Sequence, residues 1–106
     1  MSKHYLVLST IDSKEVAEQI AHHVVEERLA ACVNIISDIA SVYKWKGTLE
    51  RATESLLVFK STQECLPRLI ERIKDLHTYE LPEVIALPIE DGHPPYLDWI
   101  VSQTTK

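Results

Sequence analysis

The chain has 106 residues, of which 45% are hydrophobic, and its 11 basic and 16 acidic side chains give a formal net charge of -5 at pH 7. This length suits a single domain over 1–106 and leaves no room for a second core. The acidic balance argues against a nucleic-acid partner, and because neither a signal-peptide pattern nor an apolar segment of about 20 residues is present, we expect a cytoplasmic protein without membrane contact.

The first expected elements are a short strand and an amphipathic helix. The run HYLVLS at 4–9 is rich in β-favouring residues and is followed by polar residues typical of a turn. Asp12 and Glu15 then have the spacing of a capping box, and apolar residues recur on one helical face as far as Val24. The pattern predicts a strand at 4–9 and a helix over about 13–28.

A long β-hairpin is expected next. Its outgoing arm is the β-favouring stretch 31–43, and Gly47 supplies a tight turn before a returning arm that becomes continuously apolar at 56–59. Unbroken, the outgoing arm would extend about 43 Å, whereas a globule of this size is only about 33 Å across. A bulge at Ser37 and Asp38 would shorten the arm. The exposed tip, with Tyr43 and Trp45, still favours contact with other copies of the chain.

A second helix, a last strand and a terminal helix complete the chain. Ser61 and Glu64 have capping-box spacing, but Pro67 has to lie near a helix start, so we expect the cap at or after Ser61 and the helix end near His77. The run EVIALPI at 83–89 predicts a strand, and Pro94 with the proline after it predicts a helix start. The order β-α-β-β-α-β is that of an α+β, ferredoxin-like antiparallel sheet with both helices on one face.

The stretch HTYELPE, with one histidine, one tyrosine and two glutamates, suggests a site. His77 ends a helix and Glu83 opens a strand, so we expect His77, Glu80 and Glu83 to form a metal site, since imidazole and carboxylates suit Cu(II) or Zn(II). Tyr79 would line a ligand pocket beside them, together with residues from the hairpin. These pocket residues are Trp45, Lys60 and Tyr79.

A purely structural interpretation of the same stretch stays open. In it, His77 caps helix carbonyls, Tyr79 packs with a hydrogen-bonded hydroxyl, and the glutamates pair with Lys60 or Arg72. Elsewhere, Tyr43, Trp45 and Trp99 are typical of interface packing. Two further residues, Cys32 and Cys65, lack ligand-like spacing and are expected to be reduced thiols.

Five segments together resemble the CutA divalent-cation tolerance family, over nearly the whole chain: Ala30–Ile35, Tyr43–Gly47, Lys60–Ser61, His77–Ile85 and Tyr96–Trp99. The resemblance implies a ferredoxin-like homotrimer whose hairpin reaches onto neighbouring subunits, a role in divalent-cation and especially copper tolerance, and an architecture shared with PII signalling proteins. Thr78 departs from the family, which usually has proline there. Ser9 and Leu76 stand where some members have cysteine and histidine, so a copper site built on those groups does not carry over.

Other functions have less support in the sequence. A PII-like small-molecule sensor and a trimeric scaffold for protein interaction remain alternatives, the first resting on analogy of fold. An RNA-recognition domain would need a basic-Gly-aromatic signature where this chain has LLVFK. The chain has no nucleophile-elbow motif and only two glycines, so neither an enzyme nor a phosphate-binding organic cofactor is expected.

Overall fold

A four-stranded antiparallel sheet and three helices make up the fold of residues 3–105, the part of the chain that the computed structural model describes. The strands are β1 (His4–Ile11), β2 (Cys32–Trp45), β3 (Thr48–Thr62) and β4 (Ile85–Pro88), in the sheet order β2-β3-β1-β4. The helices are α1 (Lys14–Glu26), α2 (Leu66–Leu76) and α3 (Pro94–Thr104). No described helix combines the length and apolar character that a bilayer span requires. The predicted α+β, ferredoxin-like order with a C-terminal helix is confirmed.

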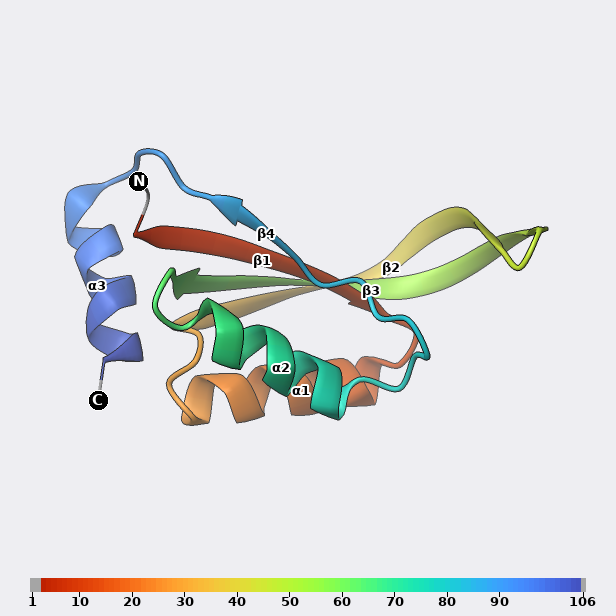
Figure 1. Ribbon diagram of the computed structural model, residues 1–106, viewed down its shortest axis with the longest axis horizontal. Coiled ribbons are helices and arrows are strands. Elements are labelled where there is room, and N and C mark those ends of the chain that lie inside the picture. The colour runs from red at the N-terminus through yellow and green to blue at the C-terminus, as the bar shows by residue number, and fades with distance from the viewer. Residues whose placement is uncertain (1–2, 106) are drawn as a thin grey trace.

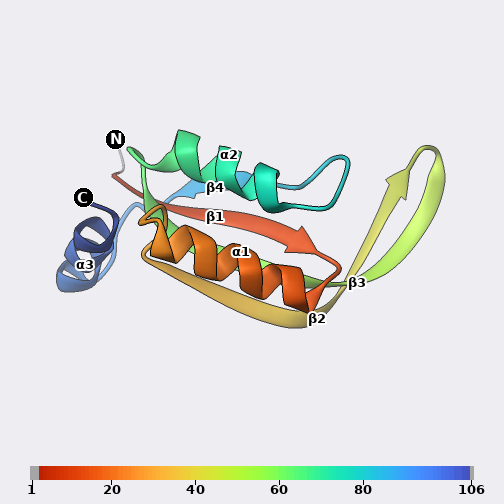
Figure 2. The same ribbon diagram turned by 90° about the horizontal axis from the view of Figure 1, so that it is seen from below.

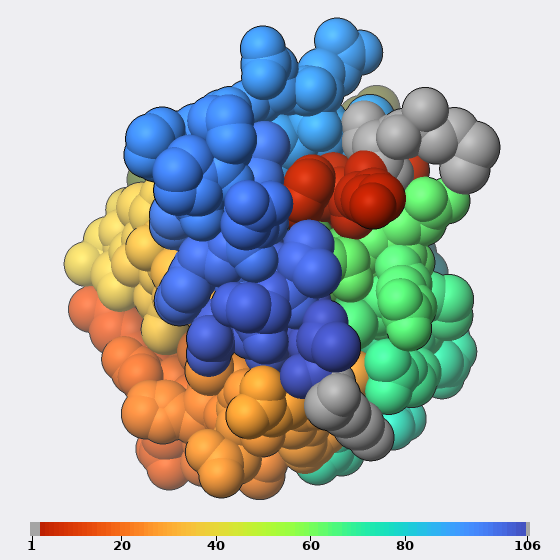
Figure 3. All heavy atoms as spheres, turned by 90° about the vertical axis from the view of Figure 1, so that its left-hand side faces the viewer, coloured from red at the N-terminus to blue at the C-terminus, as the bar shows by residue number. Residues whose placement is uncertain are grey.

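Two of the helices cover one face of the sheet and the third closes one end. α1 and α2 lie side by side beneath the sheet (Figure 1), whereas α3 packs across the end where the chain begins (Figure 3). Side-chain alternation along β1 and β3 directs every second residue toward α1 and α2. The fully buried residues on this side include Val7, Ile11, Leu57, Phe59, Ile20, Val24, Leu69 and Ile73.

Ser9 lies on the same buried face, and its hydroxyl makes no hydrogen bond to the described residues. The residue is 0% exposed, and its Oγ has no hydrogen-bond partner within residues 3–105. A buried hydroxyl without a partner loses its hydration and gains nothing in return. Ser61 offers the contrast, because its buried Oγ donates to the Leu29 carbonyl at 2.6 Å.

We predict that Ser9→Ala raises the free energy of unfolding by about 1 kcal/mol, because the substitution removes an unpaired buried hydroxyl. Ser61→Ala is the matched control and is expected to lower it by about 1–3 kcal/mol, since it leaves the Leu29 carbonyl unpaired. Urea denaturation followed by circular dichroism measures both. A Ser9→Ala protein that is less stable than the parent would show that this hydroxyl has a partner.

The helix starts differ in detail from the capping patterns of the sequence. Ser13 is the N-cap of α1, and its Oγ accepts a hydrogen bond from the Val16 N–H at 3.1 Å, so the expected capping box beginning at Asp12 is wrong. α1 also ends before residue 28, because Arg28 has φ 59 and leaves the helical conformation. α2 starts after Ser61 as expected, with Pro67 in its first two positions.

The hairpin of β2 and β3 is the longest feature of the molecule. Lys46 and Gly47 form its two-residue turn, both with positive φ (52° and 82°), and the second is a glycine as this geometry favours. The register shifts between Ile36 and Ile39, with Asp38 at φ 63, which confirms the predicted bulge. The molecule measures 44 × 25 × 22 Å, and the hairpin tip extends past both helices (Figure 2).

The sheet face opposite α1 and α2 carries many apolar residues. Cross-strand pairing places the side chains of Leu8, Val58 and Ile85 in one row across this face. Neighbouring rows add Leu6, Leu56, Leu87 and Ile36, of which the last two are 43% and 49% exposed. We call these seven residues the open face.

β4 is shorter than the sequence predicts. The expected strand covered 83–89, but only Ile85–Pro88 pairs with β1, at the edge of the sheet. Val84 instead packs against the core, and Glu83 belongs to the loop that follows α2. A proline is tolerated at such a strand end because its missing N–H is not needed by a further strand.

Candidate functional site

His77 acts as a bridge between α2 and β1. Its backbone N–H donates to the Ile73 carbonyl at the end of α2, and its ring Nε2 lies 2.8 Å from the Thr10 carbonyl oxygen at the end of β1. The Tyr79 N–H donates to Nδ1 at 3.1 Å, so Nδ1 is an acceptor and Nε2 carries the proton that Thr10 accepts. Both ring nitrogens are therefore used inside the chain. The expected cap on the helix carbonyls is confirmed for the backbone N–H of His77, whereas its ring points to β1.

Tyr79 ties the same loop to β3. Its ring packs edge-on against the His77 ring, with centroids 4.6 Å apart, and its hydroxyl donates to Glu54 Oε2 at 2.7 Å. Burial, followed by the hydrogen bond to the Glu54 carboxylate, raises the pKa of Tyr79 above its ordinary value, so the hydroxyl remains a donor at neutral pH. The expected hydrogen bond of this hydroxyl is confirmed, and its partner is a residue that the sequence interpretation missed.

A groove of 680 Å³ lies between the hairpin and the loop after α2. The hairpin supplies Tyr43 and Trp45, the loop supplies Tyr79 to Leu81 and Glu83, and the end of β1 closes one side. The remaining lining residues are Thr10, Asp12, Ser41, Val42, Ala52 and Glu54. We call this hollow the hairpin groove. It brings Trp45 and Tyr79 together, as the pocket hypothesis expects.

The hairpin groove is negatively charged. Among its twelve described lining residues, the four charged ones are Asp12, Glu54, Glu80 and Glu83. Lys46 lies outside the lining, with Nζ 3.8 Å from Glu80 Oε2 and 5.6 Å from the Trp45 ring centroid. A concave surface lined by one sign of charge concentrates counter-ions, so this groove favours cations over anions.

Lys60 does not join the groove within one chain. It pairs across the sheet with Leu6 and Cys32, and its Nζ lies 3.9 Å from the Cys32 sulfur. It lies six positions along β3 from Glu54, a span of about 20 Å at 3.3 Å per residue. The expectation that Lys60 shares a pocket with Trp45 and Tyr79 is thus wrong for a single chain.

The expected metal ligands do not form a ready site in the chain. His77 has no free ring nitrogen, and Glu80 pairs with Lys46 rather than with Lys60 or Arg72. Within residues 3–105, no group of three or more His, Cys, Asp or Glu side chains is placed to hold a metal ion. Both cysteines are free thiols, as expected, and they lie on different elements. The metal role of His77, Glu80 and Glu83 stays a prediction.

The expected interface aromatics lie at opposite ends of the molecule. Tyr43 and Trp45 are on the hairpin and are 43% and 37% exposed, whereas Trp99 is on α3 and is 40% exposed. Trp99 stacks at a tilt on Tyr96, with centroids 5.4 Å apart. An interface that uses all three expected aromatics would therefore involve both ends of the subunit.

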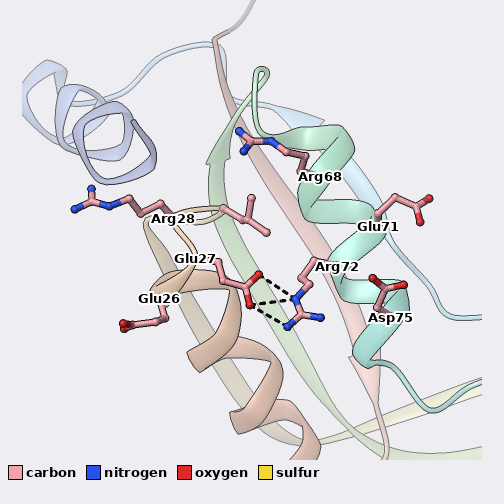
Figure 4. Close-up of a pocket in the computed structure, with 8 residues that line it drawn as sticks. Glu26, Glu27, Arg28, Arg68, Glu71, Arg72 and Asp75 are labelled. Carbon is pink, nitrogen blue, oxygen red and sulfur yellow. Dashed lines mark hydrogen bonds and ion pairs between the residues drawn. The ribbon is translucent and has the colours of Figure 1, made fainter. Parts of the chain in front are cut away.

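A second hollow, between α1 and α2, is rich in charged residues, and an ion pair spans it (Figure 4). Arg72 donates to both carboxylate oxygens of Glu27, at 2.9 to 3.2 Å. Arg28 donates to the Thr105 carbonyl and Arg68 to the Cys65 sulfur, so the two guanidinium groups have separate partners. This arrangement joins the two helices and α3 and does not gather free charges around one point.

Comparison with known proteins places the chain in a family. The family model described as CutA1 divalent ion tolerance protein matches residues 5–103. A curated relative, the divalent-cation tolerance protein CutA of Thermus thermophilus, is 50% identical over 99 residues, which cover 93% of this chain and 96% of the relative. The mouse Protein CutA is 50% identical over 91 residues, covering 86% of this chain but only 51% of the mouse protein. The chain thus spans about half the length of this longer relative.

Solved structures agree with the sequence match. The Cut A1 structure from Thermus thermophilus superposes with a TM-score of 0.93 at 48% identity, covering 96% of this chain and 99% of that one. The CutA structure from Xylella fastidiosa gives a TM-score of 0.96 at 38% identity, covering 98% of this chain and 100% of that one. The family model, the sequence relatives and the superposed structures all lead to one conclusion: the chain belongs to the CutA divalent-cation tolerance family.

Proposed function

We propose that this protein contributes to divalent-cation tolerance as a cytoplasmic homotrimer that binds divalent metal ions and catalyses no reaction. The observation that carries the binding role is the acidic hairpin groove, where all four charged lining residues are carboxylic acids. Membership of a family described as divalent ion tolerance proteins supports the same role. A binding function also fits the histidine contacts, because no described histidine nitrogen hydrogen-bonds to a hydroxyl or thiol that it could activate.

Two surfaces support self-association. The open face leaves Ile36 on β2 and Ile85 and Leu87 on β4 from 43% to 49% exposed, and an apolar surface of this kind marks an interaction site. The hairpin tip adds the exposed Val42 and Leu49, 66% and 69% exposed, beyond the shelter of its own helices. Sister chains in a trimer would cover both surfaces at once.

The metal proposal depends on carboxylates more than on imidazole. His77 would have to give up a hydrogen bond to Thr10 or to Tyr79 before it could bind an ion. Asp12 and Glu83 are exposed and line the groove, and Glu80 would give up only an exposed ion pair with Lys46. Copper remains the first metal to test, because Cu(II) binds most tightly among the divalent first-row ions at a given nitrogen or oxygen site.

We expect calorimetric titration with Cu(II) to show binding in the micromolar range, and the double variant Glu80→Gln/Glu83→Gln to weaken it at least about tenfold, which is about 1.4 kcal/mol. His77→Gln is expected to change the affinity by less than about threefold, because both ring nitrogens of His77 are already hydrogen-bonded and neither is free to bind a metal ion. Zn(II) and Mn(II) titrations under the same conditions rank the metals. Binding no tighter than about millimolar by the native oligomer would remove the metal role.

The cytoplasm is our proposal for the compartment, since both cysteines are unpaired and reduced thiols are typical of a reducing environment. Relatives carry other names: the Arabidopsis thaliana protein is called chloroplastic, and the Archaeoglobus fulgidus structure is titled periplasmic. Family membership is therefore not an argument for the compartment of this chain.

A second candidate function, a small-molecule sensor, is favoured by one observation. The hairpin groove has aromatic walls, from Tyr43, Trp45 and Tyr79, in addition to its acidic lining. A concave site with apolar walls and a few placed polar groups is typical of small-molecule binding. A thermal-shift screen against metabolites tests this function, because a ligand that binds the folded state raises the melting temperature.

A further inference from the structure

Glu54 is a buried carboxylate that forms no ion pair within residues 3–105. The residue is 6% exposed, and its Oε2 accepts the Tyr79 hydroxyl hydrogen at 2.7 Å. Its Oε1 accepts no hydrogen bond from residues 3–105 but keeps some solvent-accessible surface. The side chain lines the hairpin groove. The free oxygen thus meets the groove. A buried carboxylate is normally paired with a cation or fully hydrogen-bonded, so this one is incomplete.

Aromatic rings stand beside this carboxylate. Trp45 and Tyr43 line the same groove from the hairpin, and Trp45 already has one ammonium near its ring, that of Lys46 at 5.6 Å from the centroid. An ammonium or guanidinium group within about 6 Å of such a ring is attracted by its negative face. Lys46 itself is exposed, with 71% of its side chain in solvent, so a ligand inside the groove can compete with it.

We propose that the hairpin groove binds a small organic cation, an alkylammonium or guanidinium group on an apolar stem, with Glu54 as the counter-charge and Trp45 and Tyr43 against the stem and head. This ligand class is different from a divalent metal ion and goes beyond the tolerance role. Glu54 offers one accessible oxygen, which suits a single ammonium or guanidinium group, whereas a metal ion requires several ligands and would need the other carboxylates of the groove. The three other carboxylates of the lining, Asp12, Glu80 and Glu83, are exposed and draw a cation toward the groove.

The test uses n-butylammonium as the probe and n-butanol as its neutral counterpart, added to the native protein labelled with nitrogen-15. Saturable shifts of the Trp45 indole resonance, assigned with a Trp99→Phe variant, are expected with the amine and not with the alcohol. Glu54→Gln is expected to weaken amine binding at least about tenfold. This variant keeps an oxygen for the Tyr79 hydroxyl, so the fold and the loop position are preserved.

Two control variants sharpen the outcome. Glu90→Gln removes the same charge at an exposed position outside the groove lining and is expected to bind the amine like the parent. Lys46→Met removes the competing ammonium and is expected to bind about two- to threefold more tightly. Equal affinity in Glu54→Gln and the parent, or no shift at 50 mM amine (an excess of about 10 over a weak, roughly 5 mM site), would overturn the proposal.

The same variants separate a ligand site from a contact between subunits. If the amine fails to bind and Glu54→Gln instead lowers the trimer fraction in sedimentation, the groove receives a neighbouring chain and the ligand proposal is wrong. Copper titrations of Glu54→Gln run alongside, so that the metal role and the organic-cation site can fail separately. Loss of copper binding with retained amine binding would leave the present proposal standing.

Discussion

Val58→Glu is expected to convert the proposed trimer into single chains. Val58 lies in the middle strand pair of the open face, opposite Leu8 of β1 and Asn34 of β2. A carboxylate there stays hydrated in a single chain but is buried without a partner when copies pack on this face, at a cost of several kcal/mol. A loss of about 4 kcal/mol weakens association about 1,000-fold. Sedimentation velocity measures the change. A protein concentration of 10 µM is suitable, because a complex weakened by this factor dissociates at roughly this concentration.

The matched control for this variant is Gln19→Glu, which adds the same charge at an exposed position on α1. It is expected to sediment as the parent does. Circular dichroism establishes that both variants are folded, so that dissociation is not confused with unfolding. A folded, stable parent chain that already sediments as a monomer at this concentration would contradict the role of the open face.

His77→Ala is expected to lower the free energy of unfolding by about 2–4 kcal/mol. The substitution leaves the Thr10 carbonyl and the Tyr79 N–H without their partner, each at about 1–2 kcal/mol, and removes the edge-on packing against the Tyr79 ring. The loss follows from a structural role and does not require a metal. Urea denaturation in the presence of a chelator measures it.

His22→Ala is the control for His77→Ala, because His22 is exposed and only pairs with Glu18 at 3.5 Å. Its effect is expected to stay below about 0.5 kcal/mol. His77→Gln should recover part of the loss, since its amide can both donate and accept. If His77→Ala were as stable as the parent in chelator but lost stabilisation by copper, the histidine would be a metal ligand after all.

Local patterns explain why much of the fold could be predicted. The β-favouring run of β1 and the apolar run of β3 predict strands, and the helical stripes of α1 and α2 each reflect one buried face. The hairpin turn could be predicted in the same way, because it requires a positive φ and Gly47 adopts one readily. Boundaries were less predictable: β4 is shorter than 83–89 because Glu83 and Val84 are used by the loop and the core.

The sequence predicted part of the candidate site. Trp45 and Tyr79 meet at the groove because the hairpin arm and the loop after α2 end on the same side of the sheet. Lys60 was misplaced because motif proximity in sequence says nothing about strand register, which puts it six residues along β3 from Glu54. Glu54 was missed because a glutamate at the start of an apolar run looks like an ordinary strand boundary.

By itself, the sequence determined the class of fold, the long hairpin with its bulge, and the family, since these depend on residue type and spacing along the chain. Only the tertiary structure decided the role of each polar side chain. His77 has the composition of a ligand, but Thr10 and Tyr79 occupy both of its nitrogens. Glu54 has no motif, yet it is the buried charge at the groove. Hydrogen-bond partners come from residues 25 and 67 positions away, and such distant pairings are set by packing and not by local spacing.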